Sequence, residues 1–164
     1  MTRRSLPVPP RSAVPPRSAV PLALDQHLTW RLHRINKLSD KLSSDAYTQE
    51  FGLPVGEARC LAAIGNFAPL SVKDLAARAN LNKAQASRAA QALTERGLVS
   101  KQASPLDGRG VVLTTTRKGH KLWTGVMALI ARRNQEIFGC LSGAERRQLG
   151  AMLDRLIAQA GSES

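Results

Sequence analysis

The chain has 164 residues, which suits one domain of ordinary size. Hydrophobic residues make up 43% and aromatic residues only 4%, so the core must be built from Leu, Ile, Val and Ala, which favours helices. Lys and Arg number 24 against 12 Asp and Glu, a formal net charge of +12, which predicts a polyanionic partner: DNA, RNA or an anionic membrane surface. No apolar run is long enough to span a bilayer, and Pro-rich sequence stands where a signal peptide would be apolar, so we expect a soluble cytoplasmic protein.

Cysteine and histidine spacing argues against a metal site or an enzyme. Cys60 and Cys140 are far apart and neither belongs to a C-x-x-C motif. The three histidines, at positions 27, 33 and 120, have no metal-ligand spacing, and no nucleophile motif or phosphate loop is present, so we predict no cofactor. Both cysteines fall in apolar helical patterns, where small buried side chains are expected. A redox role for Cys60 is the alternative.

Residues 1–21 differ from the rest in composition. A hexapeptide, Pro9–Val14, is repeated directly as Pro15–Val20, and the segment carries four Arg and no acidic residue. Proline at this density blocks helix and sheet, so we expect an extended or disordered arm. Two interpretations stay open: a basic arm that touches phosphate, or a sequence duplication without a role.

A long amphipathic helix is predicted within residues 22–52. Apolar residues recur from near Leu24 at steps of three and four, while the residues between them are polar. They are Leu28, Leu32, Ile35, Leu38, Leu42 and Ala46. About six turns exceed the usual length of a globular helix, and Gly52 and Pro54 end the region.

Three shorter helices follow. The first is predicted over 55–67, the second begins at the capping residue Ser71, and the third covers roughly 83–96 after a tight turn at 80–82. Asn82 is a good N-cap for the third, and Gly97 stands where a helix commonly ends.

The remaining chain predicts a hairpin and two more helices. Two short β-type runs, 98–101 and 111–115, flank the turn-rich segment 105–110. A fifth helix begins near Arg117, and a last one begins at a capping box starting at Ser142. The fold class is therefore mainly α with a small β-hairpin wing.

Short helix, tight turn, second helix and hairpin are the order of a winged helix-turn-helix. The helix 83–96 can bury Ala86, Ala89, Ala90 and Leu93. Its opposite face then presents Lys83, Gln85, Ser87 and Arg88 near the N-terminal end, which is the end that enters a major groove. Gln can read adenine, Arg and Lys can read guanine, and Ser is permissive.

The hairpin tip carries further candidates. Arg109 lies between two glycines, and an Arg at such a tip can enter the minor groove of A·T tracts. Asp107 cannot favour DNA by itself, so its expected role is to orient Arg109 or an Arg of the preceding helix.

Residues 70–119 resemble the MarR family of transcriptional regulators. The resemblance rests on Leu70–Ala76 at the start of the helix-turn-helix, Leu93–Val99 at its exit, Asp107–Arg109 in the wing and Thr116–Gly119 after it. Thr115 departs from the family, which usually has Leu there, and the Ala-rich helix 83–96 leaves the base contacts open. The resemblance implies Ser71 as a further DNA contact.

The same resemblance implies a homodimer that binds double-stranded DNA, most simply as a repressor. Residues 22–52 and 117–164 would form a helical dimerisation base, and 53–116 the DNA-binding lobe. Recognition helices about 34–36 Å apart would require a pseudo-palindromic operator. Relatives respond to aromatic or phenolic acids, and Trp30, His33 and Arg34 lie in the region that would bind one. Packing or surface roles for these three are the alternative.

A non-sequence-specific architectural nucleic-acid-binding protein is the competing function. It predicts similar affinity for random DNA and for the protein's own promoter, whereas a regulator predicts a specificity ratio of about 10³ or more.

Overall fold

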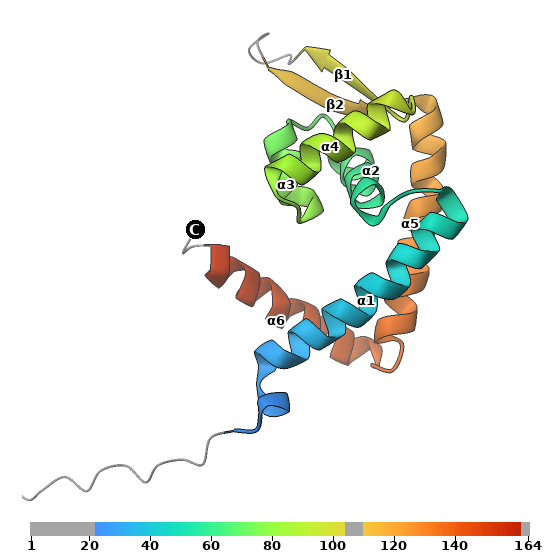
Figure 1. Cartoon of the computed structure of the whole chain (residues 1–164). Coiled ribbons are helices and arrows are strands. Elements are labelled where there is room, and N and C mark those ends of the chain that lie inside the picture. The colour runs from blue at the N-terminus through green and yellow to red at the C-terminus, as the bar shows by residue number, and fades with distance from the viewer. Residues whose placement is uncertain (1–21, 104–109, 162–164) are drawn as a thin grey trace, which may run out of the picture. The chain divides into compact units, whose positions relative to one another are not determined.

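The computed structural model describes residues 22–103 and 110–161, and the chain divides into two compact units, Met1–Ile35 and Asn36–Ser164. The helices are α1 (Leu28–Phe51), α2 (Val55–Phe67), α3 (Val72–Ala79), α4 (Lys83–Glu95), α5 (Arg117–Phe138) and α6 (Gly143–Gly161), with a 3-10 turn at Leu24–Gln26 (Figure 1). The strands are β1 (Val99–Ala103) and β2 (Val111–Thr115). The predicted fold class, mainly α with a small β-hairpin, is confirmed.

The first long helix begins later than the apolar pattern predicts. His27 is extended, with φ −72° and ψ 135°, so the turn at Leu24–Gln26 is separated from α1. The apolar residues of α1 are exposed in both units: Leu28, Leu32 and Ile35 in the first, and Leu38 and Leu42 in the second. The chain by itself therefore leaves the apolar stripe of α1 uncovered.

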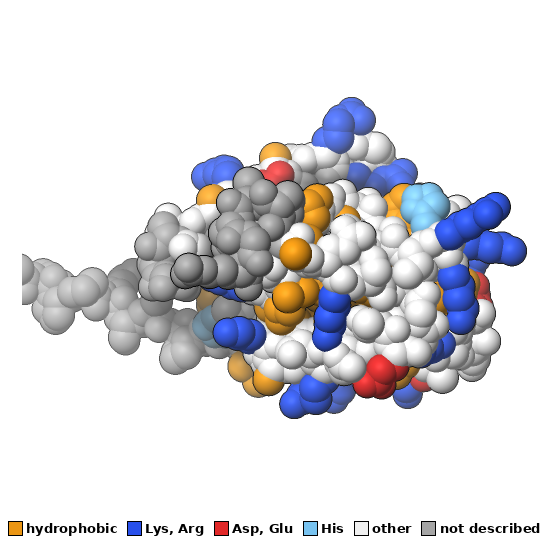
Figure 2. All heavy atoms as spheres, turned by 90° about the horizontal axis from the view of Figure 1, so that it is seen from above, with side chains coloured by type: hydrophobic (Ala, Val, Ile, Leu, Met, Phe, Trp, Pro, Cys, Tyr) orange, Lys and Arg blue, Asp and Glu red, His pale blue; other side chains and the backbone are white. Residues whose placement is uncertain are grey.

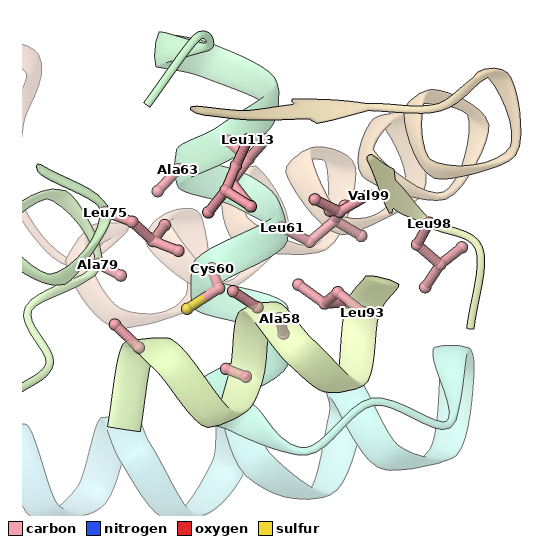
Figure 3. Packing of buried hydrophobic residues seen from close by; sticks show 14 of the residues in the cluster. Ala58, Cys60, Leu61, Ala63, Leu75, Ala79, Leu93, Leu98, Val99 and Leu113 are labelled. Carbon is pink, nitrogen blue, oxygen red and sulfur yellow. The ribbon is translucent and has the colours of Figure 1, made fainter. Parts of the chain in front are cut away.

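The core of the second unit is built from α2, α3, α4, α5 and the hairpin. Leu61, Leu75, Leu93 and Leu113, one from each of four elements, are completely buried. Figure 3 shows their side chains converging with those of neighbouring alanines and Cys60. Most buried residues are Leu, Ala or Val, as the low aromatic content predicts.

The hairpin is antiparallel and is joined to the helix-turn-helix. Its register pairs Val99 with Thr115 and Ala103 with Val111. Leu113 also exchanges two backbone hydrogen bonds with Leu70, of 2.8 and 3.2 Å, just before α3. These bonds fix the base of the wing to the first helix of the motif. Strand β1 lies one to two residues later than predicted, while β2 has the predicted bounds.

The two cysteines differ in environment. Cys60 is completely buried on α2, as expected. Cys140 is exposed, so the expectation of a second buried cysteine is wrong. The reason is that α5 ends at Phe138, and Cys140 therefore lies in the turn to α6 rather than on the apolar stripe of a helix.

Helix α6 has an uncovered apolar stripe. None of its residues is buried, and Met152, Leu156 and Ile157 are exposed by 45%, 56% and 69%. An apolar helix without core contacts gains little from folding onto its own chain. No helix within the described residues is both long and apolar enough to cross a membrane.

Candidate nucleic-acid interface

The turn between α3 and α4 is shaped by two asparagines. Asn80 adopts the left-handed conformation, with φ 53° and ψ 48°, which Asn tolerates better than most side chains. Asn82 caps α4: its Oδ1 accepts from the Gln85 N–H at 2.8 Å, while the Asn82 N–H donates to Gln85 Oε1 at 3.1 Å. The predicted turn and N-cap are thus present.

Helix α4 has the two faces predicted for a recognition helix. Its inward face consists of Ala86, Ala89, Ala90 and Leu93, all buried against α2 and α3. Alanines allow close approach because they are narrow. The opposite face is consequently held outward by a rigid scaffold.

Lys83, Ser87 and Arg88 are exposed on α4. Within the described part of the chain, their side chains have no hydrogen bond or ion pair. They are free to bind an external partner. Gln85 is also exposed, but its Oε1 takes part in the capping box, so its Nε2 amide is the group left for a donor contact.

Ser71 serves first as the N-cap of α3. Its Oγ accepts from the Asp74 N–H at 3.1 Å and donates to the Asp74 carboxylate at 2.7 Å. The hydroxyl is half-buried and already bonded, so its local role is to start the helix.

Sequence reasoning missed a polar link between α4 and the hairpin. Lys101 Nζ on β1 donates to Gln91 Oε1 at 2.6 Å, and Gln91 Nε2 donates to Glu95 at 2.8 Å. Gln91 lies three residues after Arg88, so helical spacing could have indicated it. Figure 2 shows Lys and Arg side chains spread over the face that carries the motif, with acidic side chains sparse.

Two predicted wing residues, Asp107 and Arg109, lie outside the described residues. Their roles stay predictions from the sequence. Trp30, His33 and Arg34 lie on α1 in the first unit and are exposed, and their role also stays a prediction.

A cavity of about 460 Å³ opens behind the motif in the second unit. Asp40 and Arg59 form an ion pair of 2.5 Å in its wall, and the Arg78 guanidinium lies 4.6 Å from the centre of the Phe67 ring. Asn80, the turn residue before α4, also lines it. The sequence did not indicate this cavity because its wall comes from α1, α2, α3 and α5 together.

The family follows from comparison with known proteins. The sequence model of the MarR family matches residues 51–110, which span α2, α3, α4 and the first strand. The chain belongs to the MarR family. The HTH-type transcriptional repressor Rv2887 of Mycobacterium tuberculosis is 26% identical over 135 residues, covering 82% of this chain and 96% of that protein.

Solved structures share the fold of this MarR-family chain. A MarR/EmrR family transcriptional regulator from Acinetobacter sp. ADP1 has a TM-score of 0.78 at 24% identity and covers 86% of this chain and 99% of that one. Bordetella bronchiseptica BpsR, whose DNA binding is regulated by 6-hydroxynicotinic acid, has a TM-score of 0.74 at 20% identity, covering 84% and 97%. The winged-helix assignment is confirmed, and the chain is a transcriptional regulator rather than an enzyme.

Proposed function

We propose that this protein represses transcription as a homodimer on a pseudo-palindromic operator, with α4 of each copy in a major groove. The observation that carries the proposal is the free outward face of α4, with Lys83, Ser87 and Arg88 unpaired beside a buried Ala/Leu face. A major groove about 12 Å wide admits one such helix.

Each polar group has a proposed role. Arg88 and Lys83 read guanine, Gln85 donates to a base through its Nε2, and Ser87 makes permissive contacts. Ser71 and Lys101 bind the DNA backbone. Arg109, oriented by Asp107, enters the adjacent minor groove; this part of the proposal rests on the sequence alone.

The homodimer is supported by the apolar surface that one chain leaves uncovered. In the second unit, Leu38, Leu42, Leu156 and Ile157 are exposed, and in the first unit Leu28, Leu32 and Ile35 are exposed as well. Apolar stripes on long helices are normally buried against another helix. A second copy provides the same stripes in return.

The decisive experiment is a footprint on the upstream region of the protein's own gene, followed by binding titrations. We expect a protected, roughly palindromic site and an affinity about 10³-fold or more above that for random DNA. Arg88→Ala and Arg109→Ala should each weaken operator binding by about 1–3 kcal/mol. Arg147→Ala removes an equal charge from the exposed surface of α6 and should change affinity little.

Equal affinity for operator and random DNA would instead establish the architectural function. Unchanged binding by Arg88→Ala would remove α4 from base reading. Unchanged binding by Arg109→Ala would remove the wing from the mechanism.

Release by an aromatic acid is a second candidate function, favoured by the 460 Å³ cavity beside Asn80. The structural relative BpsR responds to 6-hydroxynicotinic acid. A ligand held between Arg78 and Arg59 would press on the turn that positions α4, and Trp30, His33 and Arg34 are proposed to help bind it. Titrating 6-hydroxynicotinic acid and benzoate into the operator complex tests this: if neither releases DNA, release by such acids is excluded.

A further inference from the structure

A second cavity, of about 310 Å³, lies in the second unit between α1, α2 and α5. Apolar side chains form much of its wall, among them Val55, Ile137 and Phe138. Tyr47 and Arg133 also line it. Its volume is at the lower end of the roughly 300–1,000 Å³ found for small-molecule sites. Neither the DNA contacts nor the 460 Å³ cavity uses Arg133.

Arg133 is incompletely paired. Its side chain is only 14% exposed, and Nη1 donates to the Glu136 carboxylate. Nε and Nη2 are buried without a hydrogen-bond partner among the described residues. Buried N–H groups of a cation without partners are costly, because they have lost water and gained nothing in exchange. A partner for these two groups is therefore expected.

The two free groups define the chemistry of that partner. The Nε–H and one Nη2–H lie in one plane on the same side of a guanidinium and point in parallel. This edge matches the two oxygens of a carboxylate, which accept both hydrogen bonds at once. Since Glu136 occupies Nη1, the free edge is the bidentate one.

The surroundings favour an anion with an apolar body. Burial raises the pKa of Tyr47, and the nearby positive charges of Arg59 and Arg133 oppose that rise, so both cations act on the cavity wall beside the phenol. Arg59 is countered by Asp40 at 2.5 Å, which leaves Arg133 as the cation with unused donors. The apolar wall would not favour a fully hydrated inorganic anion.

We propose that this second cavity binds a small monocarboxylate with an apolar body, held by Nε and Nη2 of Arg133 and flanked by Tyr47. The site is separate from the proposed DNA contacts, so it goes beyond the proposed function. It also differs from the 460 Å³ cavity, although Asp40 and Arg59 line both.

The test is calorimetric titration of benzoate into the full-length protein without DNA. We expect saturable binding by the wild type and an affinity at least tenfold lower for Arg133→Met. Methionine is long and apolar, so the fold should be kept, and circular dichroism and thermal melting check this. Arg78→Met is the matched control, because it removes a cation from the other cavity and should leave benzoate affinity within twofold.

Probe and variant pairs separate the alternatives. Benzamide, which lacks the charge, and sulfate, which lacks the apolar body, should each bind at least tenfold more weakly than benzoate. Arg133→Lys keeps the charge but loses the parallel donors, and it too should bind benzoate more weakly. If Arg133→Met does not fold, Arg133→Lys and Tyr47→Phe provide the comparison.

Three results would overturn the proposal. One is equal benzoate affinity in wild type and the Arg133 variants. Another is benzoate binding that Arg78→Met abolishes, which would place the site in the other cavity. The third is no benzoate binding by the wild type, as when a carboxylate of a second copy fills the Arg133 edge. Operator binding is measured separately, so failure of either proposal is recognised independently.

Discussion

On α4, side-chain width decides how the reading face is presented. Ala86, Ala89 and Ala90 fill the buried face with minimal volume, so the helix lies close to α2 and α3. Arg88 and Ser87 face away from this packing and are unpaired within the described residues. An alanine face has little freedom to rotate among alternative packings, which favours a fixed orientation of the reading residues.

Cys60 is expected to be chemically inert. Burial, together with the nearby Glu57 charge, raises the pKa of its thiol to about 12, so the reactive thiolate is scarce at pH 8. Iodoacetamide at pH 8 should modify exposed Cys140 and spare Cys60 in the folded protein, as read by mass spectrometry. The variant Cys140→Ser should take up no label until it is denatured; labelling of native Cys60 would reopen the redox interpretation.

Gly119 has no room for a side chain. A Cβ there would lie 1.8 Å from the Leu98 carbonyl oxygen, which is backbone and cannot move aside cheaply. Gly119→Ala should therefore lower the free energy of unfolding by about 1–3 kcal/mol. Gly56→Ala is the matched control in the first turn of α2, where nothing lies within 4 Å, and it should stabilise by about 0.5 kcal/mol. Chemical denaturation measures both; equal effects would contradict the clash.

At the scale of elements, side-chain caps define where the helices begin. Ser71, Asn82, Thr116 and Ser142 each accept a hydrogen bond from the backbone N–H three residues later. Thr116 also donates to the Gly97 carbonyl at 2.8 Å, which ties the start of α5 to the end of α4. Caps thus set both the helix ends and the joints between them.

Loss of the Asn82 cap should loosen α4 at the end proposed to enter DNA. Asn82→Ala removes the acceptor for the Gln85 N–H and should cost about 1 kcal/mol of stability. Asn82→Ser keeps an acceptor and should stay within about 0.5 kcal/mol of the wild type. Thermal or urea unfolding measures the difference. If Ala and Ser behave alike, the cap does not stabilise α4.

At the scale of the whole molecule, the uncovered stripes of α1 and α6 carry the prediction of a dimer. Ile157→Glu places a charge on the apolar stripe of α6 and should weaken association by about 2 kcal/mol or more. Sedimentation over a concentration series should show the variant dissociating at concentrations where the wild type is dimeric. Its melting temperature should depend on concentration more strongly.

Arg155→Ser on the same helix tests whether the effect is specific to the apolar stripe. Arg155 is exposed, and the substitution leaves the stripe intact. Dimerisation should be nearly unchanged. A wild-type protein that sediments as a monomer would contradict the proposed homodimer and leave the exposed residues of α6 without a partner.

Local patterns in the sequence determined much of the fold. The bounds of α2 and β2, the caps at Ser71 and Asn82 and the buried face of α4 all follow from residues within a few positions of each other. Such features depend on backbone hydrogen bonds and helical spacing, which a sequence displays directly. The family motifs likewise lie in one contiguous stretch, residues 51–110.

Only the tertiary structure decided which distant side chains meet. The Lys101–Gln91 bond, the ion pair of Asp40 with Arg59 and the two cavities each join elements far apart in the chain. The unpaired edge of Arg133 was invisible in the sequence, because a hydrogen bond that is not made depends on everything packed around it. Helical spacing predicts which face of a helix is buried, and packing in three dimensions decides what that face encloses.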